Sequence, residues 1–92
     1  MDTHALRDVV AKGRLEMVEA GHVVFARYRR REGQLIIDHV EAPPALRGSG
    51  AAGRFMERLA RLARERGERI VPICGYAETW LRRSAEHRDL IA

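Results

Sequence analysis

The feature that most constrains the fold is a change in hydrophobic period at the two prolines Pro43 and Pro44. Before them, three short segments are rich in strand-forming side chains and are separated by turn sequences: residues 14–20, 22–30 and 34–40. After them, apolar residues recur at the three- and four-residue spacing of an amphipathic helix over residues 50–66. The chain is therefore expected to form an antiparallel β-meander first and then a long helix that covers it.

Two further elements complete the expected fold. Residues 69–74 predict a fourth strand, and residues 76–83 predict a short helix that carries Trp80 and Leu81 as core or partner-facing side chains. Because the third and fourth strands are joined through a helix, they should run parallel in a right-handed crossover. The prediction is an α/β (α+β) fold: a meander, a βαβ unit and a short C-terminal helix. Residues 6–12 form either an irregular lead-in or a short strand.

Length and composition indicate one small globular domain over residues 1–92, with residues 1–12 as the lead-in. Apolar residues make up 46% of the chain and charged residues 33%, which separates it from disordered sequences. No apolar run approaches the roughly 20 residues that span a bilayer, and residues 1–12 do not resemble a secretion signal. Cys74 is the only cysteine, so no internal disulfide can form. These features favour a cytoplasmic protein and no membrane partner.

Charge and histidine spacing exclude two other classes of function. Seventeen basic against thirteen acidic residues give a net charge of +4, which favours an anionic ligand without requiring a polyanion. The arginines near the second turn have no interleaved aromatic side chains, so a solvated hairpin is expected there rather than a nucleic-acid surface: Arg27, Arg29, Arg30 and Arg31. The four histidines are dispersed without ligand spacing, so no metal site is expected: His4, His22, His39 and His87.

The segment between the third strand and the long helix is the strongest candidate for a binding site. It consists almost entirely of small residues behind one arginine: Arg47, Gly48, Ser49, Gly50, Ala51, Ala52 and Gly53. The N–H groups at a helix start attract anions, and bare backbone lets a diphosphate approach closely. Arg47 can add a charge-assisted hydrogen bond. The alternative is a tight turn that needs glycine only for its backbone geometry.

Residues 47–52 also resemble a known motif, the acetyl-CoA pyrophosphate signature of the GCN5-related N-acetyltransferases. Over residues 13–91 the chain is similar to the short, single-domain members of that family. The shared motifs are His39-Val40-Glu41, the turn at residues 43–48, Pro72-Ile73-Cys74, Tyr76 and Asp89-Leu90. Two positions depart from the usual pattern: Ala52 stands where glycine is common, and Gly75 stands where many relatives have proline.

The resemblance implies acetyl-CoA as the cofactor and a particular way of holding it. In that family the third and fourth strands of the present scheme splay apart, and the pantetheine arm enters the gap. Backbone groups of Val40, Glu41 and Ala42 would pair with the arm. Pro72 agrees with this expectation independently, because a residue without an N–H group suits a strand that leaves its neighbour. The alternative is that the fourth strand is an ordinary edge strand.

Four side chains are candidates for catalysis under the same resemblance. Cys74 would be a nucleophile or a wall of the amine site, although a free cysteine is often only a small buried residue. His39 and Glu41 point to one face of their strand, where either could accept a proton or make an ordinary structural hydrogen bond. Tyr76 could protonate the leaving thiolate or could pack under the last helix.

The segment before the meander is too short to supply the helices that build the acceptor pocket in larger relatives. The acceptor site should therefore be open and shallow. The sequence thus predicts an acetyl-CoA-dependent N-acetyltransferase that acts on an exposed amine, such as one on a peptide or protein. A CoA-binding module without turnover and a basic interaction protein are the alternatives, and the sequence leaves the oligomeric state open.

Overall fold

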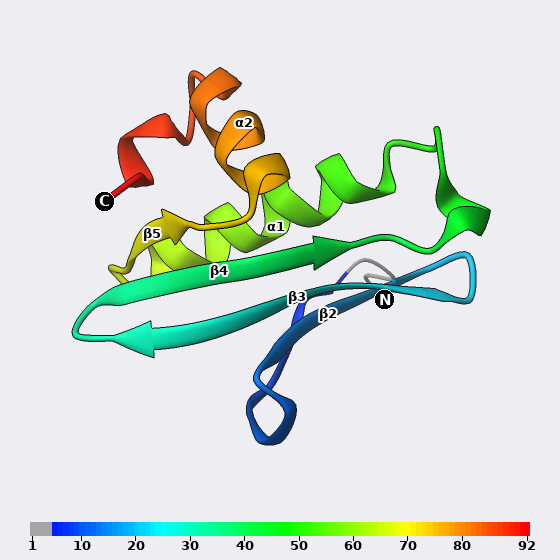
Figure 1. Cartoon of the computed structure of the whole chain (residues 1–92), viewed down its shortest axis with the longest axis horizontal. Coiled ribbons are helices and arrows are strands. Elements are labelled where there is room, and N and C mark those ends of the chain that lie inside the picture. The colour runs from blue at the N-terminus through cyan, green and yellow to red at the C-terminus, as the bar shows by residue number, and fades with distance from the viewer. Residues whose placement is uncertain (1–4) are drawn as a thin grey trace.

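The alternating strands form one five-stranded sheet in the order β1-β2-β3-β4-β5, as the computed structural model shows for residues 5–92 (Figure 1). The strands are β1 (Arg7–Val9), β2 (Arg14–Glu19), β3 (His22–Arg31), β4 (Gln34–Glu41) and β5 (Arg69–Pro72). The α-helices are α1 (Ala51–Glu65) and α2 (Gly75–Arg83), and three short 3₁₀ turns cover Val10–Lys12, Pro44–Leu46 and Arg88–Leu90. The expected α+β class is confirmed. Residues 1–4 of the predicted lead-in lie outside the described part of the chain.

Alternation along the meander places one set of apolar side chains against the helices. Leu15 and Met17 of β2 and Val24 and Ala26 of β3 are fully buried in one core. Glu16, which lies between Leu15 and Met17, points to the opposite face and pairs with arginines of β1 and β2 at 3.3 and 3.4 Å. The period of two in these segments therefore decides which face of the sheet carries the core.

Helix α1 closes that core because its apolar side chains recur on one stripe. Phe55, Met56 and Leu59 are fully buried, and each such side chain contributes roughly 1.5–3 kcal/mol by leaving water. The helix connects β4 to β5, which run parallel as expected for a crossover. Figure 1 shows α2 beside α1, and Leu81 of α2 joins the same core.

Of the two alternatives for residues 6–12, the short strand is present, since Arg7–Val9 pairs antiparallel with β2. Two boundaries differ from the sequence prediction. Strand β5 ends at Pro72 rather than at residue 74. Helix α2 begins at Gly75 rather than at residue 76. The position of β1 has a visible cause: Asp8 accepts hydrogen bonds from Tyr28 at 2.5 Å and from Arg30 at 2.9 Å, which hold this strand in place.

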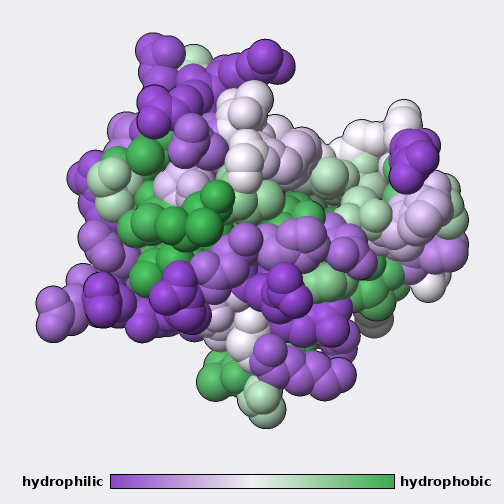
Figure 2. Space-filling model, viewed as in Figure 1, coloured by the Kyte–Doolittle hydropathy of each residue, from purple (hydrophilic) through white to green (hydrophobic). Residues whose placement is uncertain are grey.

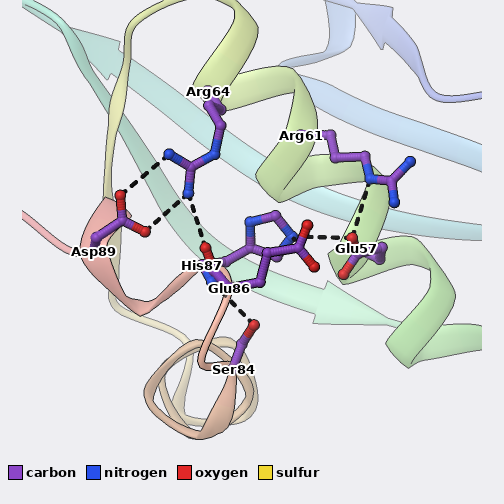
Figure 3. A network of polar contacts seen from close by, with 7 residues as sticks. All are labelled: Glu57, Arg61, Arg64, Ser84, Glu86, His87 and Asp89. Carbon is purple, nitrogen blue, oxygen red and sulfur yellow. Dashed lines mark hydrogen bonds and ion pairs between the residues drawn. The ribbon is translucent and has the colours of Figure 1, made fainter.

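The C-terminal residues after α2 are attached to α1 through a buried histidine (Figure 3). His87 is 1% exposed and stacks on Trp80 with ring centroids 6.2 Å apart. Its Nε2 lies 2.9 Å from Glu57 Oε1, and because an ionised carboxylate only accepts, Nε2 is the donor. This hydrogen bond, together with that from Arg61, lowers the pKa of Glu57. One ion pair in a separate position, Arg64 to Asp89 at 2.8 Å, fastens the same segment.

We expect Glu57→Gln to lower the free energy of unfolding at pH 7 by about 1 kcal/mol, because it removes a charge-assisted hydrogen bond to a buried ring. The folded pKa of Glu57 lies below its ordinary value of 4.5, so this stabilisation is present above that value and is lost as the pH falls. The deficit of the variant should therefore shrink as the pH falls below 4.5. Urea unfolding at pH 7 and at pH 3.5 measures both values.

Glu78→Gln is the matched control for that experiment. Glu78 also pairs with an arginine four residues later on a helix, Arg82 at 3.5 Å, but its side chain is 49% exposed. An exposed pair of this kind contributes roughly 0.3–0.5 kcal/mol. Equal losses in the two variants would show that the contact with His87 adds nothing.

Candidate functional site

Strands β4 and β5 separate at Ile37. Their parallel pairing runs from Gln34 opposite Arg69 to Ile37 opposite Pro72 and then stops, although β4 continues to Glu41. Beyond Pro72, the N–H groups of Ile73 and Cys74 both donate to the Ile37 carbonyl at 3.0 Å. Figure 1 shows β4 extending well past the short β5. The expected splayed arrangement is therefore present, and within residues 5–92 no strand pairs with β4 on that side from residue 38 onward.

Beyond this separation β4 carries His39, Val40 and Glu41. Val40 packs against the helix-covered core, so His39 and Glu41 point to the opposite face. His39 Nε2 lies 3.0 Å from Glu41 Oε1, and the ring meets Phe25 edge-on with centroids 6.3 Å apart. Because the carboxylate only accepts, Nε2 carries the proton, and Nδ1 is the basic nitrogen of the neutral ring. The two side chains predicted to share a face are indeed in contact.

Cys74 and Tyr76 lie where β5 passes into α2. Cys74 is partly buried against the core, and within residues 5–92 its thiol makes no hydrogen bond to His39 or Glu41. Tyr76 is 44% exposed, which disfavours the alternative that it packs under the last helix. Partial burial, and then electrostatic interaction with Cys74, raise the pKa of the Tyr76 phenol above its ordinary value of 10. Tyr76 therefore stays protonated at neutral pH close to Cys74.

The small-residue segment turns sharply before α1 begins. Gly48 and Gly50 have φ angles of 78° and 85°, in the left-handed region that strongly favours glycine. The Ser49 hydroxyl donates to the Leu46 carbonyl at 2.6 Å and accepts the N–H of Ala51 at 3.2 Å. Backbone geometry thus accounts for two of the three glycines without any ligand. Gly53, in contrast, has an ordinary helical backbone in the first turn of α1.

The remaining N–H groups of that first turn are the ones available to an anion. Ala51 is 1% exposed and its N–H is taken by Ser49, whereas Ala52 and Gly53 are partly exposed. First-turn N–H groups have no partner within the helix. Arg47 is exposed and has no acidic partner within residues 5–92. The segment therefore offers a helix start and one unpaired guanidinium to a negatively charged group.

No role was predicted for Arg54 from the sequence. Its guanidinium folds back over the segment: Nη2 donates to the Ser49 carbonyl at 2.9 Å, and Nε donates to Glu19 Oε1 at 2.6 Å. The only signal in the sequence is its position four residues after Gly50, which brings a helical side chain next to the turn that precedes it. Glu19, from the end of β2, could not have been assigned to this region from sequence.

A groove on α2 was also missed. It has a volume of about 330 Å³ and is lined by Tyr76, Thr79, Trp80, Arg83 and Ser84. The Trp80 Nε1 atom lies 3.6 Å from the position that a Cβ atom on Gly53 would take. Trp80, which lines the groove, thus also lies beside the first turn of α1. In sequence terms Trp80 was only a core or partner-facing residue.

Two groups outside this region bear on the alternatives. Arg29 and Arg30 of the hairpin are paired with carboxylates, at 2.7 Å to Asp38 and 2.8 Å to Glu68, so part of that basic cluster is neutralised. His87 is far from the other histidines in the sequence, but one ring nitrogen of His87 and one carboxylate oxygen each of Glu57 and Glu86 lie within 4.8 Å of one another (Figure 3). Its Nε2 is used as a hydrogen-bond donor to Glu57. No helix within residues 5–92 has the length and apolar composition needed to cross a membrane.

Comparison with known proteins agrees with this geometry. The family model for GCN5-related N-acetyl-transferases matches residues 14–90, and the chain therefore belongs to that family. A GCN5-like protein from Staphylococcus aureus, whose structure was determined by NMR, has a similar fold. The TM-score is 0.66 at 16% sequence identity, over 100% of this chain and 91% of that one. Among curated proteins, none matches the sequence.

The glycines should respond differently to alanine. Gly50→Ala should lower the free energy of unfolding by about 1–2 kcal/mol, because a Cβ is strained at this φ. Gly53→Ala should raise it by about 0.5–1 kcal/mol, because the backbone is helical and the nearest atom is at ordinary contact distance. Urea denaturation of the two variants measures the difference. A destabilised Gly53→Ala would contradict the assignment of Gly53 as an unstrained helical position.

Proposed function

We propose that this domain transfers an acetyl group from acetyl-CoA to an exposed amine of a peptide or protein. The observation that carries the proposal is the coincidence of two features at the carboxyl end of β4. The strand loses its β5 neighbour after Ile37, and a few residues later the chain enters the small-residue turn before α1. One ligand that is both extended and doubly charged fits the two features together.

The residues around β4 and the small-residue turn suit two parts of acetyl-CoA, the pantetheine arm and the diphosphate. Backbone groups of Val40, Glu41 and Ala42 lie on the unpartnered length of β4 and its continuation, as a pantetheine arm requires. The N–H groups of Ala52 and Gly53 in the first turn of α1, and the side chain of Arg47, suit a diphosphate. We assign these contacts to residues 40–42 and 47–53. When bound, acetyl-CoA supplies the acetyl group as an activated thioester.

The side chains around the opening suit acyl transfer. A bond forms between the amine nitrogen and the carbonyl carbon while the carbon–sulfur bond breaks. We assign His39 Nδ1 as the acceptor of the amine proton, with Glu41 orienting the ring through Nε2. We assign the Tyr76 phenol, which is protonated at neutral pH, as the donor of a proton to the departing thiolate. We assign Cys74 as a wall of the site, because its side chain is partly packed into the core.

The acceptor class follows from exposure. Ile73, next to Cys74, is 61% exposed, and Tyr76 is 44% exposed. Figure 2 shows a hydrophobic area over β5, surrounded by hydrophilic side chains. The groove on α2 is open rather than enclosed. A small polar amine would find few walls here, whereas a residue on a larger chain can bring its own contacts, which supports a peptide or protein acceptor.

A CoA-binding module without turnover is the second candidate. One observation favours it: Cys74 lies on the core side of the sheet, whereas His39 and Glu41 point to the other face. If no assembled catalytic set is needed, binding alone would explain the turn and the splayed strands. The two candidates differ in whether the acetyl group is transferred from bound acetyl-CoA to an amine.

Acetyl-CoA should stabilise the folded chain. At a ligand concentration 100-fold above Kd, binding adds about 2.7 kcal/mol, which raises Tm by on the order of 10 °C for a domain of this size. Ala52→Glu should abolish the shift, because its carboxylate repels the diphosphate, while the same negative charge at a helix start preserves the ligand-free Tm. Thermal unfolding with and without acetyl-CoA measures both effects.

Ala11→Glu is the control, since Ala11 is exposed in the turn between β1 and β2. This variant should keep the full shift in Tm. If acetyl-CoA leaves the wild-type Tm unchanged at millimolar concentration, the proposed cofactor is wrong.

Tyr76→Phe should lower kcat for acetylation of a peptide amine by about 100-fold, the usual scale for loss of a general acid, and leave the Kd for acetyl-CoA unchanged. Cys74→Ala should change kcat by less than about tenfold, because a wall residue forms no covalent intermediate. Steady-state release of CoA thiol over a panel of peptides provides the measurement. Absence of turnover by the wild type across that panel, with binding intact, would select the binding module instead.

A further inference from the structure

Arg54 occupies the place where the proposed diphosphate would approach. Its main-chain N–H donates to the Gly50 carbonyl at 3.1 Å, as the first full turn of α1 closes. The side chain then folds back, and Nη2 donates to the Ser49 carbonyl at 2.9 Å. Nη1 lies 2.9 Å from the position that a Cβ on Gly50 would take, closer than real Cβ contacts allow. The guanidinium therefore rests directly on the bare side of Gly50.

Glu19 holds the guanidinium there from the opposite side. Arg54 Nε donates to Glu19 Oε1 at 2.6 Å, and the Glu19 side chain is 11% exposed, whereas that of Arg54 is 44% exposed. Glu19 ends β2, so the contact joins the β2–β3 hairpin to the start of α1. A carboxylate beside an anion-binding turn repels an anion unless a cation neutralises it. Arg54 provides that neutralisation.

We propose that Arg54 is a ligand of the diphosphate, held in position by Glu19 until the diphosphate arrives. On binding, the two Nη groups turn from the Ser49 carbonyl to the phosphate oxygens, and Nε keeps its bond to Glu19. The inference rests on the proposed function, because it takes the diphosphate of a CoA ligand as the group that binds at residues 47–53. It adds to that function a residue outside the motif and a partner, Glu19, from a different part of the sheet.

This exchange of hydrogen bonds favours a role of Arg54 as a ligand of the diphosphate over a role as a side chain that blocks the site. Arg54 gives up one hydrogen bond to a neutral carbonyl and gains two to charged oxygens, which are stronger and match the fork of the guanidinium. Its exposed side chain can turn without disturbing the core. Because Glu19 already fixes Nε, less side-chain freedom is lost on binding than for Arg47, which is exposed and has no acidic partner within residues 5–92.

Calorimetric titration of the full chain with coenzyme A and with dephospho-CoA tests the proposal. Arg54→Ala should weaken binding of both ligands by about tenfold or more, because both carry the diphosphate. Arg54→Lys should weaken it less, because it keeps the charge and loses only the fork. Pantetheine lacks the diphosphate, so its affinity, followed by NMR chemical shifts, should be equal for the wild type and Arg54→Ala.

Arg61→Ala is the matched control. Arg61 lies about two turns further along α1, and its Nε donates to Glu57 Oε1 at 3.0 Å. This variant removes the same charge and should change the affinity for coenzyme A by less than about threefold. The ligand-free Tm of each variant shows that the fold is retained.

Three results would overturn the proposal. If Arg54→Ala binds coenzyme A as tightly as the wild type, Arg54 is not a ligand of the diphosphate, and if the variant binds more tightly, Arg54 blocks the site. If it loses affinity for pantetheine to the same degree, its effect does not act through the diphosphate. If the wild type binds no coenzyme A at all, the proposed function fails, and the inference about Arg54 fails with it.

Discussion

The packing of α1 against the inner faces of β2, β3 and β4 is the interaction on which the rest of the structure depends. Phe55, Met56 and Leu59 have no exposed surface, so the helix has little freedom to slide or rotate over the sheet. The start of the helix is thereby fixed above the end of β4, and its end is fixed at the start of β5. The fixed ends of α1 therefore determine where the residues of the candidate site lie.

The candidate site depends on where the hydrogen bonding between β4 and β5 ends, which is at Ile37. A fully paired β5 would cover β4 to its end, but Pro72 has no N–H group to continue the ladder. The next two N–H groups converge on the single Ile37 carbonyl, and the chain turns into α2. The remaining length of β4 keeps its backbone groups on that side for another partner. A sheet that opens in this way combines a rigid frame with an unfilled strand position, which is what an extended ligand needs.

Charge at the small-residue turn is more balanced than the sequence indicates. The motif contains one arginine, Arg47, and the structure adds a second, Arg54, together with the carboxylate of Glu19. An arginine held by a carboxylate is ordered before any ligand is present. The turn therefore consists of more than exposed backbone, because the ion pair of Arg54 and Glu19 lies beside the start of α1.

Much of the fold could be predicted from the sequence, because local patterns control it. The alternation of Leu15, Glu16 and Met17 determines a face of the sheet, and the spacing of Phe55 and Leu59 determines a stripe of a helix. The glycine-rich turn was equally visible. The first strand, β1, was harder to predict from the sequence. The hydrogen bonds that hold it in place join Asp8 to Tyr28 and Arg30, which are about twenty residues away.

The sequence by itself determined the order of the elements, the faces they bury and the motif that places the chain in its family, because these depend on neighbours along the chain. Only the tertiary structure decided that Glu19 holds Arg54 over Gly50, that Tyr76 is exposed beside Cys74, and that His87 reaches Glu57. The contacts of Glu19 with Arg54 and of His87 with Glu57 join residues 35 and 30 positions apart, and the exposure of Tyr76 depends on how α2 packs. Their distances are set by how α1 and α2 pack on the sheet, and no local pattern contains that information.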